Sequence, residues 1–519
     1  MEDTVTAETS PADIDRIVSA AVHAADRLAA TTPVERARLL EAAADALEKA
    51  SDELVTLAAK ETHLPEQPRL RGEMVRTVFQ LRLFGQVLTD GEFLRAAVDH
   101  ADAKWPMGPR PDIRRMTVPI GPVLVFTASN FPLTLSVAGH DTAAALAAGC
   151  PVVIKAHPGH PELSERTFEI LARALTEAGA PEGTVGIIYG LESGVTALRH
   201  PGIAAAAFTG SEAGGRALFD IANARPRPIP FYGELGSVNP VVVTAAAVAA
   251  RGVEIATGYA GSFTLGAGQF CTKPGLLLLP AGHGLEDELR AAVAAIPAQH
   301  MLNERIAHGY RAGLERLTEH PAVAVLSDPT GSTDTPSRAL SASADSAGST
   351  DTPSQVPPAP APDTAEFGPT LLRVNGADFL HHSESLDAEC FGPVSLIVEY
   401  EGPEQLRAIL RELEPGLTIT LQAEESDAEL VESLLPGLTA LAGRLIWNGW
   451  PTGITLSWAQ QHGGPYPATT TPQFTSMGTA AIDRFLRPVA WQGFPEALLP
   501  APLRDANPWD VPQRVDGKR

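Results

Sequence analysis

The sequence has too few cysteines for a disulfide framework or a cysteine metal cluster. Its 519 residues include only Cys150, Cys271 and Cys390, and cysteines this few and this scattered fit the reducing cytoplasm. The first ten residues, MEDTVTAETS, carry acidic side chains where a signal peptide carries basic ones. Prolines interrupt the longest uncharged stretch, Met116 to Gly139, so a clean apolar run of about 20 residues is also missing. We therefore predict a cytoplasmic protein with no membrane segment.

The sequence has fewer basic than acidic residues. Lys and Arg number 39 against 62 Asp and Glu, which gives a formal net charge of −23. Such a surface repels phosphate backbones and anionic lipid headgroups, so we expect no nucleic-acid partner and no membrane partner. With 44% hydrophobic residues the chain can bury the cores of two large domains or of about three ordinary ones. Small molecules are the expected partners.

The N-terminal part of the sequence has a helical pattern. From Pro11 to about Val98, Ala and Leu recur at steps of three and four residues, as in TPVERARLLEAAADALEKA. Thr32 can cap a helix there, and Pro33 fits the first turn because proline lacks the N–H that a first turn leaves unpaired. We expect an opening of amphipathic helices.

Short apolar runs then alternate with longer helical segments. PVLVF, PVVIK, VGIIY, IAAAAF and PIPFYG alternate with Ala- and Leu-rich stretches, which is typical of an α/β fold with a parallel sheet. Ligands bind such sheets at the carboxyl ends of the strands. Asn130, Lys155, Gly210 and Glu234 each lie at or just beyond the end of a run, so we expect them along one edge of the sheet.

A second region of strands and helices begins near Asn239. It contains a low-complexity insertion at about 327–364, in which GSTDTPS occurs twice, at 331–337 and 348–354. This Ser-, Thr-, Asp-, Pro- and Ala-rich composition buries too little apolar area to offset the entropy of ordering. We predict a disordered surface insertion created by local duplication and without chemistry. A regulatory linker is the alternative, although the insertion has no basic cluster or aromatic anchor.

Two residues are candidates for covalent chemistry. Cys271 lies in GAGQFCTKPG, a loop whose glycines allow a ligand to approach the backbone, whereas a structural cysteine usually has apolar neighbours in a helix or strand. Glu234 ends the apolar run in FYGELGSVNP, and we expect this apolar frame to raise its proton affinity and suit it to act as a general base. From the residues alone, a buried filler cysteine and a capping or solvated carboxylate remain the alternatives.

Other residues could contact a phosphate, a ribose or an oxyanion. FTGSEAGGRAL places Gly210, Ser211 and Gly215 around a helix start, where free N–H groups bind phosphate, but the spacing is not that of a G-x-G-x-x-G fingerprint. Lys155 could meet a ribose or phosphate, and the Asn130 amide could stabilise an oxyanion. An exposed lysine and an ordinary turn asparagine are the alternatives.

The histidines show no spacing typical of metal ligands. His140, His157 and His462 are isolated in the sequence. We expect them to be structural or solvated, and we predict no metal site.

The motifs occur in one order: SNFP, VVIKAHP, FTGS followed by Gly215, GELGSVNP, GQFCTKPG and ECFGPVS. In this order the chain resembles the aldehyde dehydrogenase superfamily, from the helical opening to about Leu499. Three longer stretches look like the branch of α-ketoglutaric semialdehyde (2,5-dioxopentanoate) dehydrogenases and related NADP-using enzymes. They are SNFPLTLSVAGHDTAAALAAGCPVVIKAHPGHP, GRLIWNGWPTG and HGGPYPATTTPQFTSMGTAAIDRFLRP.

The resemblance implies a role for each candidate. Cys271 would attack the aldehyde, Asn130 and the Cys271 N–H would hold the oxyanion, and Glu234 would activate the water that hydrolyses the thioester. Lys155 would bind the adenosine ribose of the cofactor. Ser211, with Gly210, Gly215 and the following helix, would bind its pyrophosphate. Glu389 and Phe391 would hold the nicotinamide ribose and ring.

The resemblance also implies an architecture. Residues 1–238 would form the helical opening and a Rossmann-type NAD(P)-binding domain, and residues 239–465 an α/β catalytic domain. Residues 466–519 would pack back and form part of a small oligomerisation element. Such enzymes are usually homodimers or homotetramers.

Four positions depart from the usual pattern of the family. Many NAD-using members carry a glutamate three residues after the lysine, whereas this chain has Pro158. Loss of that carboxylate removes repulsion against a 2′-phosphate, so we expect NADP to be preferred and NAD to be possible. Ala128 and Ser129 replace a common Pro-Trp pair. Cys390 replaces an aliphatic residue, and we expect both Cys390 and Cys150 to pack in the core.

The expected activity is NAD(P)-dependent oxidation of an aldehyde, α-ketoglutaric semialdehyde first, to the acid through a cysteine thiohemiacetal and thioester. The alternatives are a broader range of aliphatic aldehydes, acyl transfer to a thiol such as coenzyme A, and a catalytically silent relative. The presence of Glu234 favours hydrolysis, and the intact set of Cys271, Glu234 and Asn130 disfavours a silent protein. An acidic substrate requires a cation near Cys271, and the sequence does not indicate which arginine supplies it.

Overall fold

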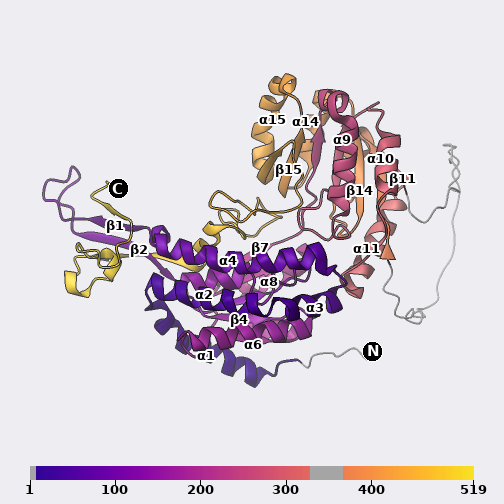
Figure 1. The fold of residues 1–519 in the computed structure, drawn as a ribbon. Helices are drawn as coiled ribbons and strands as arrows, with labels where there is room; N and C mark the ends of the chain where they lie inside the picture. The colour runs from indigo at the N-terminus through magenta and orange to yellow at the C-terminus, as the bar shows by residue number, and fades with distance from the viewer. Residues whose placement is uncertain (1–7, 328–365, 519) are drawn as a thin grey trace, which may run out of the picture.

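The helical opening folds into four helices, which lie in the lower part of the computed structural model as drawn in Figure 1. The structure describes residues 8–327 and 366–518. Thr32 caps the second helix: its Oγ1 accepts from the Glu35 N–H at 3.2 Å, and its own N–H donates to the Glu35 carboxylate at 2.7 Å. Pro33 lies in the first turn, so the predicted helix start is confirmed. The helices are α1 (Pro11–Ala29), α2 (Pro33–Lys49), α3 (Ser51–Thr62) and α4 (Arg71–Asp90).

The five apolar runs form a five-stranded sheet in which all strands are parallel. Its order, β5-β4-β3-β6-β7, is that of a Rossmann fold with the first strand at the centre. The predicted parallel sheet is therefore confirmed. Its strands are β3 (Val123–Phe126), β4 (Val152–Lys155), β5 (Val185–Ile188), β6 (Ala205–Thr209) and β7 (Phe231–Glu234), and the helices between them are α5 (His140–Ala148), α6 (Pro161–Glu177), α7 (Leu191–Arg199) and α8 (Glu212–Asn223).

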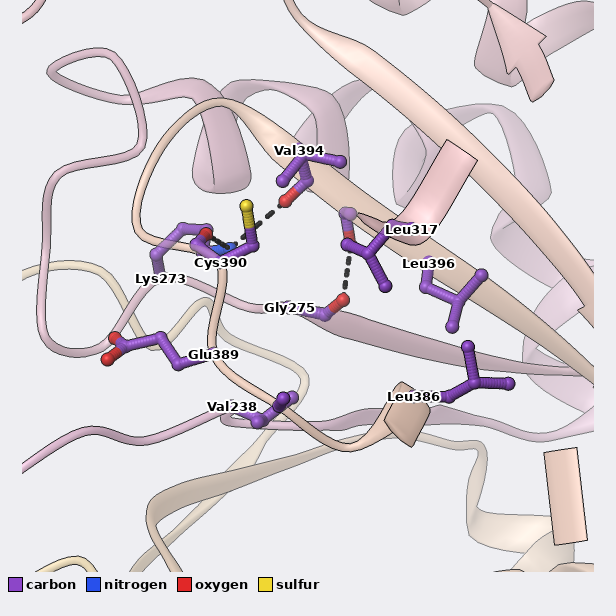
Figure 2. Close-up of a pocket in the computed structure, with 11 residues that line it drawn as sticks. Val238, Lys273, Gly275, Leu317, Leu386, Glu389, Cys390, Val394 and Leu396 are labelled. Atoms are coloured by element: carbon purple, nitrogen blue, oxygen red, sulfur yellow. Dashed lines mark hydrogen bonds between the residues drawn. The ribbon is translucent and has the colours of Figure 1, made fainter. Parts of the chain in front are cut away.

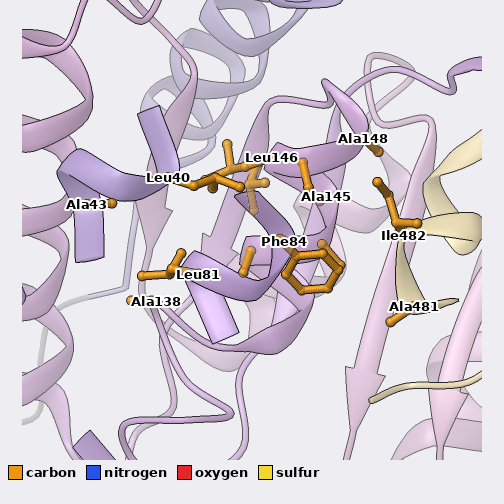
Figure 3. Packing of buried hydrophobic residues seen from close by; sticks show 14 of the residues in the cluster. Leu40, Ala43, Leu81, Phe84, Ala138, Ala145, Leu146, Ala148, Ala481 and Ile482 are labelled. Atoms are coloured by element: carbon orange, nitrogen blue, oxygen red, sulfur yellow. The ribbon is translucent and has the colours of Figure 1, made fainter. Parts of the chain in front are cut away.

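Helix α5 lies within the largest apolar cluster of the described chain. Apart from Asp141 all of its residues are buried, and its alanines let Leu81 and Phe84 of α4 approach closely, as Figure 3 shows. Ala481 and Ile482, from the C-terminal part of the chain, belong to the same cluster. Burial of one such large side chain stabilises a fold by roughly 1.5–3 kcal/mol. The core therefore joins the start and the end of the sequence.

A seven-stranded sheet carries the second half of the fold. Its order is β11-β13-β14-β9-β8-β15-β16, parallel except for the edge strand β11. The strands are β8 (Val241–Val243), β9 (Leu276–Pro280), β11 (Ala324–Ser327), β13 (Thr370–Asn375), β14 (Val394–Tyr400), β15 (Gly416–Gln422) and β16 (Ala442–Trp447). The helices of this half are α9 (Ala245–Thr264), α10 (Glu286–Ala294), α11 (Glu304–Thr318), α12 (Gly376–His381), α13 (Ser383–Leu386), α14 (Gly402–Glu412) and α15 (Ala428–Leu441). The pair β10 (Gln299–His300) and β12 (Glu366–Phe367) is separate.

A four-stranded sheet extends to one side in Figure 1. It joins β1 (Ala96–Asp99) and β2 (Ile113–Pro119) to β17 (Leu486–Gln492) and β18 (Gln513–Val515) in the order β17-β2-β1-β18. The sequence pattern predicts helix as far as about Val98, but α4 ends at Asp90 and β1 follows. Strand β1 is short and one of its partners is distant in sequence, since Ala96 pairs with Gln513. Such a strand leaves no local periodicity to detect.

Two further sequence predictions concern the duplicated insertion and the absence of a membrane segment. The repeated GSTDTPS segments lie outside the described residues. In the part of the chain that the structure describes, no helix is both long enough and apolar enough to cross a membrane.

Candidate active site

Cys271 lies on the loop that joins α9 to β9. Two glycines shape this loop, Gly266 with φ 60° and Gly268 with φ 66°. A Cβ atom on Gly268 would lie 2.2 Å from the carbonyl oxygen of Gly392, so only glycine allows the two chains to approach this closely. The same contact brings the ECFGP motif of residues 389–393 against the loop of Cys271.

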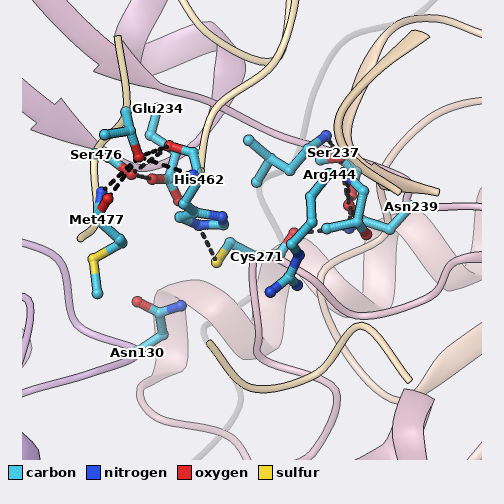
Figure 4. A network of polar contacts seen from close by, with 12 residues as sticks. Asn130, Glu234, Ser237, Asn239, Cys271, Arg444, His462, Ser476 and Met477 are labelled. Carbon is cyan, nitrogen blue, oxygen red and sulfur yellow. Dashed lines mark hydrogen bonds and ion pairs between the residues drawn. The ribbon is translucent and has the colours of Figure 1, made fainter. Parts of the chain in front are cut away.

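Asn239 fixes the backbone around Cys271. Its side-chain amide donates to the carbonyl oxygens of Cys271 at 2.8 Å, of Lys273 at 3.1 Å and of Ser237 at 3.1 Å. Its Oδ1 accepts from the Ser237 hydroxyl at 2.8 Å and from the N–H and hydroxyl of Thr418 at 3.2 and 3.1 Å. Its φ of 56° lies in the left-handed region, which asparagine tolerates. Figure 4 shows this network beside Cys271.

His462 lies between Cys271 and Glu234. Its Nε2 is 3.5 Å from the Cys271 Sγ and 3.0 Å from the Glu234 Oε1, and Figure 4 shows the sulfur pointing toward the ring. His462 is only 2% exposed, so it is not a solvated histidine. The sequence-based expectation also did not include its contacts with Cys271 and Glu234. Because one nitrogen faces the thiol and the carboxylate, His462 can exchange a proton with either.

Glu234, the last residue of β7, is held as a carboxylate. Burial opposes its ionisation, but His462 and the Ser476 hydroxyl outweigh burial and lower the pKa of Glu234 below its usual value. The prediction that the proton affinity of Glu234 is raised is therefore wrong. It rested on the apolar residues of the sequence motif around Glu234, whereas His462 and Ser476 come from a distant part of the sequence. Ser476 Oγ donates to Glu234 Oε2, and the Ser476 N–H donates to the His462 carbonyl at 2.8 Å.

The Cys271 thiol does not ionise readily by itself. Burial raises its pKa well above the usual range, and the Glu234 carboxylate adds to the rise, while Arg444 opposes it. A thiol in this state holds its proton at neutral pH and needs a base to become a nucleophile. His462 is in contact with it, and the other ring nitrogen, Nδ1, is buried without a hydrogen-bond partner in the described residues.

Asn130 lies in the loop after β3, and its side chain faces the loop of the nucleophile. Its Nδ2 donates to the carbonyl oxygen of Gln269, two residues before Cys271, at 3.3 Å. Arg69 holds its backbone, donating to the Asn130 carbonyl at 2.7 Å while its guanidinium stacks over the Phe131 ring at 4.2 Å. The structure thus brings Asn130, Cys271 and Glu234 into one neighbourhood, as the sequence predicts (Figure 4).

A pocket opens beside Cys271 and Glu234. Cys271, Glu234 and His462 form its polar end. Most of its remaining wall is apolar, which is usual for a site that takes a small molecule. The other lining residues are Arg76, Phe131, Thr134, Leu135, Phe270, Thr272, Gly453, Ile454 and Met477.

The residues expected to hold the cofactor lie along the carboxyl edge of the five-stranded sheet. Lys155 is the last residue of β4, and burial lowers its pKa to about 8. Ser211 follows β6 and caps α8, accepting from the Gly214 N–H at 3.4 Å. A Cβ atom on Gly215 would lie 2.1 Å from Leu235. Glycine at 215 therefore lets the first turn of α8 pack against Leu235, the residue after β7. The exposed N–H groups at the start of this helix can meet a phosphate.

Glu389 and Phe391 come from the other half of the fold. Burial raises the pKa of Glu389 to about 7, although Lys273 and the Ser237 N–H oppose the rise. Figure 2 shows Glu389 and Lys273 in one pocket, where the Lys273 ammonium donates to the carbonyls of Cys390 at 2.9 Å and Val394 at 3.0 Å. A Cβ atom on Gly236 would lie 2.7 Å from the Glu389 carboxylate, so Glu389 reaches the loop after β7.

The two other cysteines pack in the core, as predicted. Cys150 is fully buried, and its Sγ lies 3.4 Å from the Phe485 carbonyl. The Cys390 Sγ lies 3.9 Å from the Tyr310 carbonyl. Neither belongs to the pocket that contains Cys271.

Sequence comparison places the chain beside known enzymes. Residues 4–309 match the model of the aldehyde dehydrogenase family. The chain is 44% identical to α-ketoglutaric semialdehyde dehydrogenase 2 of Azospirillum brasilense over 98% of this chain and 92% of that one. It is 39% identical to α-ketoglutaric semialdehyde dehydrogenase of Acinetobacter baylyi over 97% and 91%.

Structural comparison gives the same fold. Aldehyde dehydrogenase 21 of Physcomitrella patens, solved with succinate, superposes with a TM-score of 0.72 at 20% identity over 93% of this chain and 91% of that one. The bifunctional proline utilization A protein superposes with a TM-score of 0.73 at 21% identity over 94% of this chain but only 45% of its own longer chain.

Proposed function

The chain belongs to the aldehyde dehydrogenase family and oxidises an aldehyde to a carboxylic acid, and on this premise we propose that its substrate is α-ketoglutaric semialdehyde and its nucleophile Cys271. The substrate is that named for the two relatives at 44% and 39% identity. The observation that carries the catalytic assignment is the contact of one His462 nitrogen with both the Cys271 thiol and the Glu234 carboxylate.

The first step is attack on the aldehyde. In the tautomer with its proton on Nδ1, His462 accepts the thiol proton at Nε2, and the resulting imidazolium donates from Nε2 to the Glu234 carboxylate. The Cys271 sulfur bonds to the carbonyl carbon to give a thiohemiacetal. The negative charge that forms on the aldehyde oxygen is met by the Asn130 amide and the Cys271 backbone N–H. Loss of one such donor costs about 2.7–4 kcal/mol in other enzymes. Asn239 contributes by keeping the Cys271 backbone in place.

Enzymes of this family use NAD or NADP, which when bound would supply the hydride acceptor for oxidation at the carbon attached to Cys271. The residues present fit such a group, because Ser211 caps α8 just beyond β6 and the first residues of this helix are exposed, so that their N–H groups can bind a phosphate. Lys155 would hold the adenosine ribose, and Gly210, Ser211 and Gly215 the pyrophosphate. Glu389 and Phe391 would hold the nicotinamide ribose and ring. We propose that NADP is preferred, since Pro158 offers no carboxylate to repel a 2′-phosphate.

The second step is hydrolysis of the thioester. Glu234 accepts a proton from water and the resulting hydroxide attacks the acyl carbon. The Cys271 sulfur leaves and takes its proton back from His462. A carboxylate already ionised by its partners is ready to accept this proton at neutral pH. This arrangement favours hydrolysis over acyl transfer to a thiol such as coenzyme A. Acid formed without added thiol separates the two.

We also propose how the chain is organised. Residues 1–238 form the helical opening and cofactor domain, 239–465 the catalytic domain and 466–519 the segment that packs back. The four-stranded sheet has strands from both ends of the chain, and we propose that it takes part in a homodimer or homotetramer. The three free cysteines support a cytoplasmic location.

The test is product formation by the purified enzyme. With α-ketoglutaric semialdehyde and NADP, we expect α-ketoglutarate and NADPH in equal amounts, at a higher kcat/KM than with NAD or with unbranched aliphatic aldehydes. Equal or greater kcat/KM for simple aliphatic aldehydes would assign a broader substrate range. Absence of turnover with every aldehyde would assign a catalytically silent relative.

A further inference from the structure

The pocket in front of Cys271 has one unusual residue in its wall. Among the described residues that line it, Arg76 of α4 is the only arginine or lysine. Its neighbours in the wall include Phe131, Leu135 and Ile454. A guanidinium is costly to place against an apolar surface unless an anion meets it.

The contacts of Arg76 leave part of the guanidinium unpaired. Nη2 donates to the carbonyl oxygen of Ile454, which fixes the side chain against the pocket wall. Nε is buried and has no hydrogen-bond partner in the described residues. No ion pair of the described chain includes Arg76, whereas its neighbour Arg69 forms one with Glu73. Arg76 therefore contributes to the pocket wall a cation that forms no ion pair with a carboxylate of the described residues.

The carboxylate of Glu73, which is near Arg76, accepts its hydrogen bonds from other groups. Glu73, one turn before Arg76 on α4, accepts from Arg69 at 2.8 Å on Oε2. Its Oε1 accepts from the N–H groups of Leu133 at 2.7 Å and Thr134 at 2.9 Å. With its oxygens committed to Arg69 and to the loop after Asn130, Glu73 leaves Arg76 without a hydrogen-bonded counterion.

Two other arginines near the site differ from Arg76. Arg69 is bonded to Glu73 and to the Asn130 carbonyl and stacks on Phe131, so its role is to position the loop of Asn130. Arg444 donates to the carbonyls of Pro451 at 2.8 Å and Gly453 at 3.4 Å and does not line the pocket. The buried Nε atoms of all three arginines lack a hydrogen-bond partner in the described residues, so what sets Arg76 apart is that it lines the pocket and the other two do not.

We propose that Arg76 binds the carboxylate of the substrate, with the aldehyde group directed to Cys271. This inference rests on the proposed function, because it assumes a substrate that carries an anion at the end opposite its aldehyde. A charge-assisted contact from Nε and a terminal N–H would hold such an anion in one orientation. Arg76 thereby selects carboxylated semialdehydes over neutral aldehydes of the same length.

The experiment compares kcat/KM for α-ketoglutaric semialdehyde, succinic semialdehyde and neutral butanal in wild type, Arg76→Met and Arg76→Lys. We expect the ratio of carboxylated to neutral substrate to fall by about 10- to 100-fold in Arg76→Met, as loss of a hydrogen bond to a charged group predicts. The loss should be mainly in KM, and Arg76→Lys should restore part of the ratio. Arg38→Met, an exposed arginine on α2, is the matched control.

A binding measurement keeps the result independent of turnover. Calorimetric titration of glutarate into Cys271→Ala, with and without Arg76→Met, should show weaker binding in the double variant by a similar factor. Unchanged substrate ratios, or equal losses with carboxylated and neutral substrates, would overturn the role of Arg76. If wild type oxidises succinic semialdehyde but not α-ketoglutaric semialdehyde, the proposed substrate is wrong. A ratio of kcat/KM for succinic semialdehyde to that for butanal that depends on Arg76 would still support carboxylate binding by Arg76.

Discussion

The Nε2 atom of His462 lies 3.5 Å from the sulfur of Cys271. The same nitrogen lies 3.0 Å from the Glu234 carboxylate, so the nucleophile and the hydrolytic base share one proton-carrying group. The sulfur and the Glu234 carboxylate also lie within 4.8 Å of each other. A thiolate and a carboxylate at this distance repel, and an imidazolium in contact with both offsets that repulsion. The two chemical steps can therefore use the same three residues in turn.

His462→Gln should slow the first step. Without a base at Nε2 the Cys271 proton must pass to solvent, and general base catalysis typically contributes about 10²–10⁴-fold. We expect the rate of the NADPH burst to fall within that range at pH 7 and to recover as pH rises, because hydroxide replaces the missing base. Stopped-flow absorbance measures this rate. His308→Gln, exposed on α11, is the control, and an identical burst rate in His462→Gln would remove His462 from the mechanism.

Glu234→Gln should make the thiol more acidic. Burial first and the Glu234 carboxylate second raise the pKa of Cys271, and the glutamine removes the negative charge while keeping the shape. A lower pKa gives more thiolate at any given pH, so the pH profile of alkylation by iodoacetamide should shift to lower pH. A profile that stays in place or moves to higher pH contradicts the assigned electrostatic contact.

Asn239→Gly should loosen the loop of the nucleophile. Glycine accepts the positive φ of this position, so the change isolates the amide that serves the carbonyls of Ser237, Cys271 and Lys273. We expect a loss of about 2–4 kcal/mol in the free energy of unfolding by urea and a lower kcat. Asn223→Gly, an exposed asparagine with a single side-chain bond to Phe219, controls for the glycine itself. Equal effects at both positions would deny Asn239 a special role.

Glu389 should make cofactor binding depend on pH. Burial raises the pKa of Glu389 to about 7, and the ionised form is the better acceptor for ribose hydroxyls. Because the ionised fraction rises with pH through this value, the Kd for NADPH should fall by up to about tenfold between about pH 6 and 8. Fluorescence titration measures the Kd. Glu389→Gln should bind more weakly and lose the pH dependence, unlike the exposed control Glu384→Gln. A pH dependence that survives in Glu389→Gln assigns it to another group.

Local sequence patterns predicted the parts of the site that end a strand or shape a turn. Lys155 and Glu234 follow apolar runs, Ser211 caps the next helix, and Cys271 lies among glycines, so each carries its signal within a few neighbouring residues. The Rossmann-type sheet was predictable for the same reason, since each of its strands is a short apolar run.

Long-range partners could not be predicted in this way. His462 is 191 residues from Cys271 and has no second ligand at a regular spacing, although it begins the HGGPYPATTT stretch that carries the family resemblance. The pKa of Glu234 was expected to rise and instead falls, because Ser476 and His462 arrive from the C-terminal part of the chain. Arg76 belongs to the predicted helical opening, where its charge looks like that of any exposed helix face.

Trapping of the acyl enzyme shows whether Cys271 carries the acyl group and Glu234 hydrolyses it. Glu234→Gln, mixed with α-ketoglutaric semialdehyde and NADP and then quenched in acid, should release one burst of NADPH per active site and stop. Mass spectrometry of the digested protein should then find the mass of α-ketoglutarate less one water on the peptide that contains Cys271. A burst without such an adduct, an adduct on Cys150 or Cys390, or continued full turnover would contradict the account.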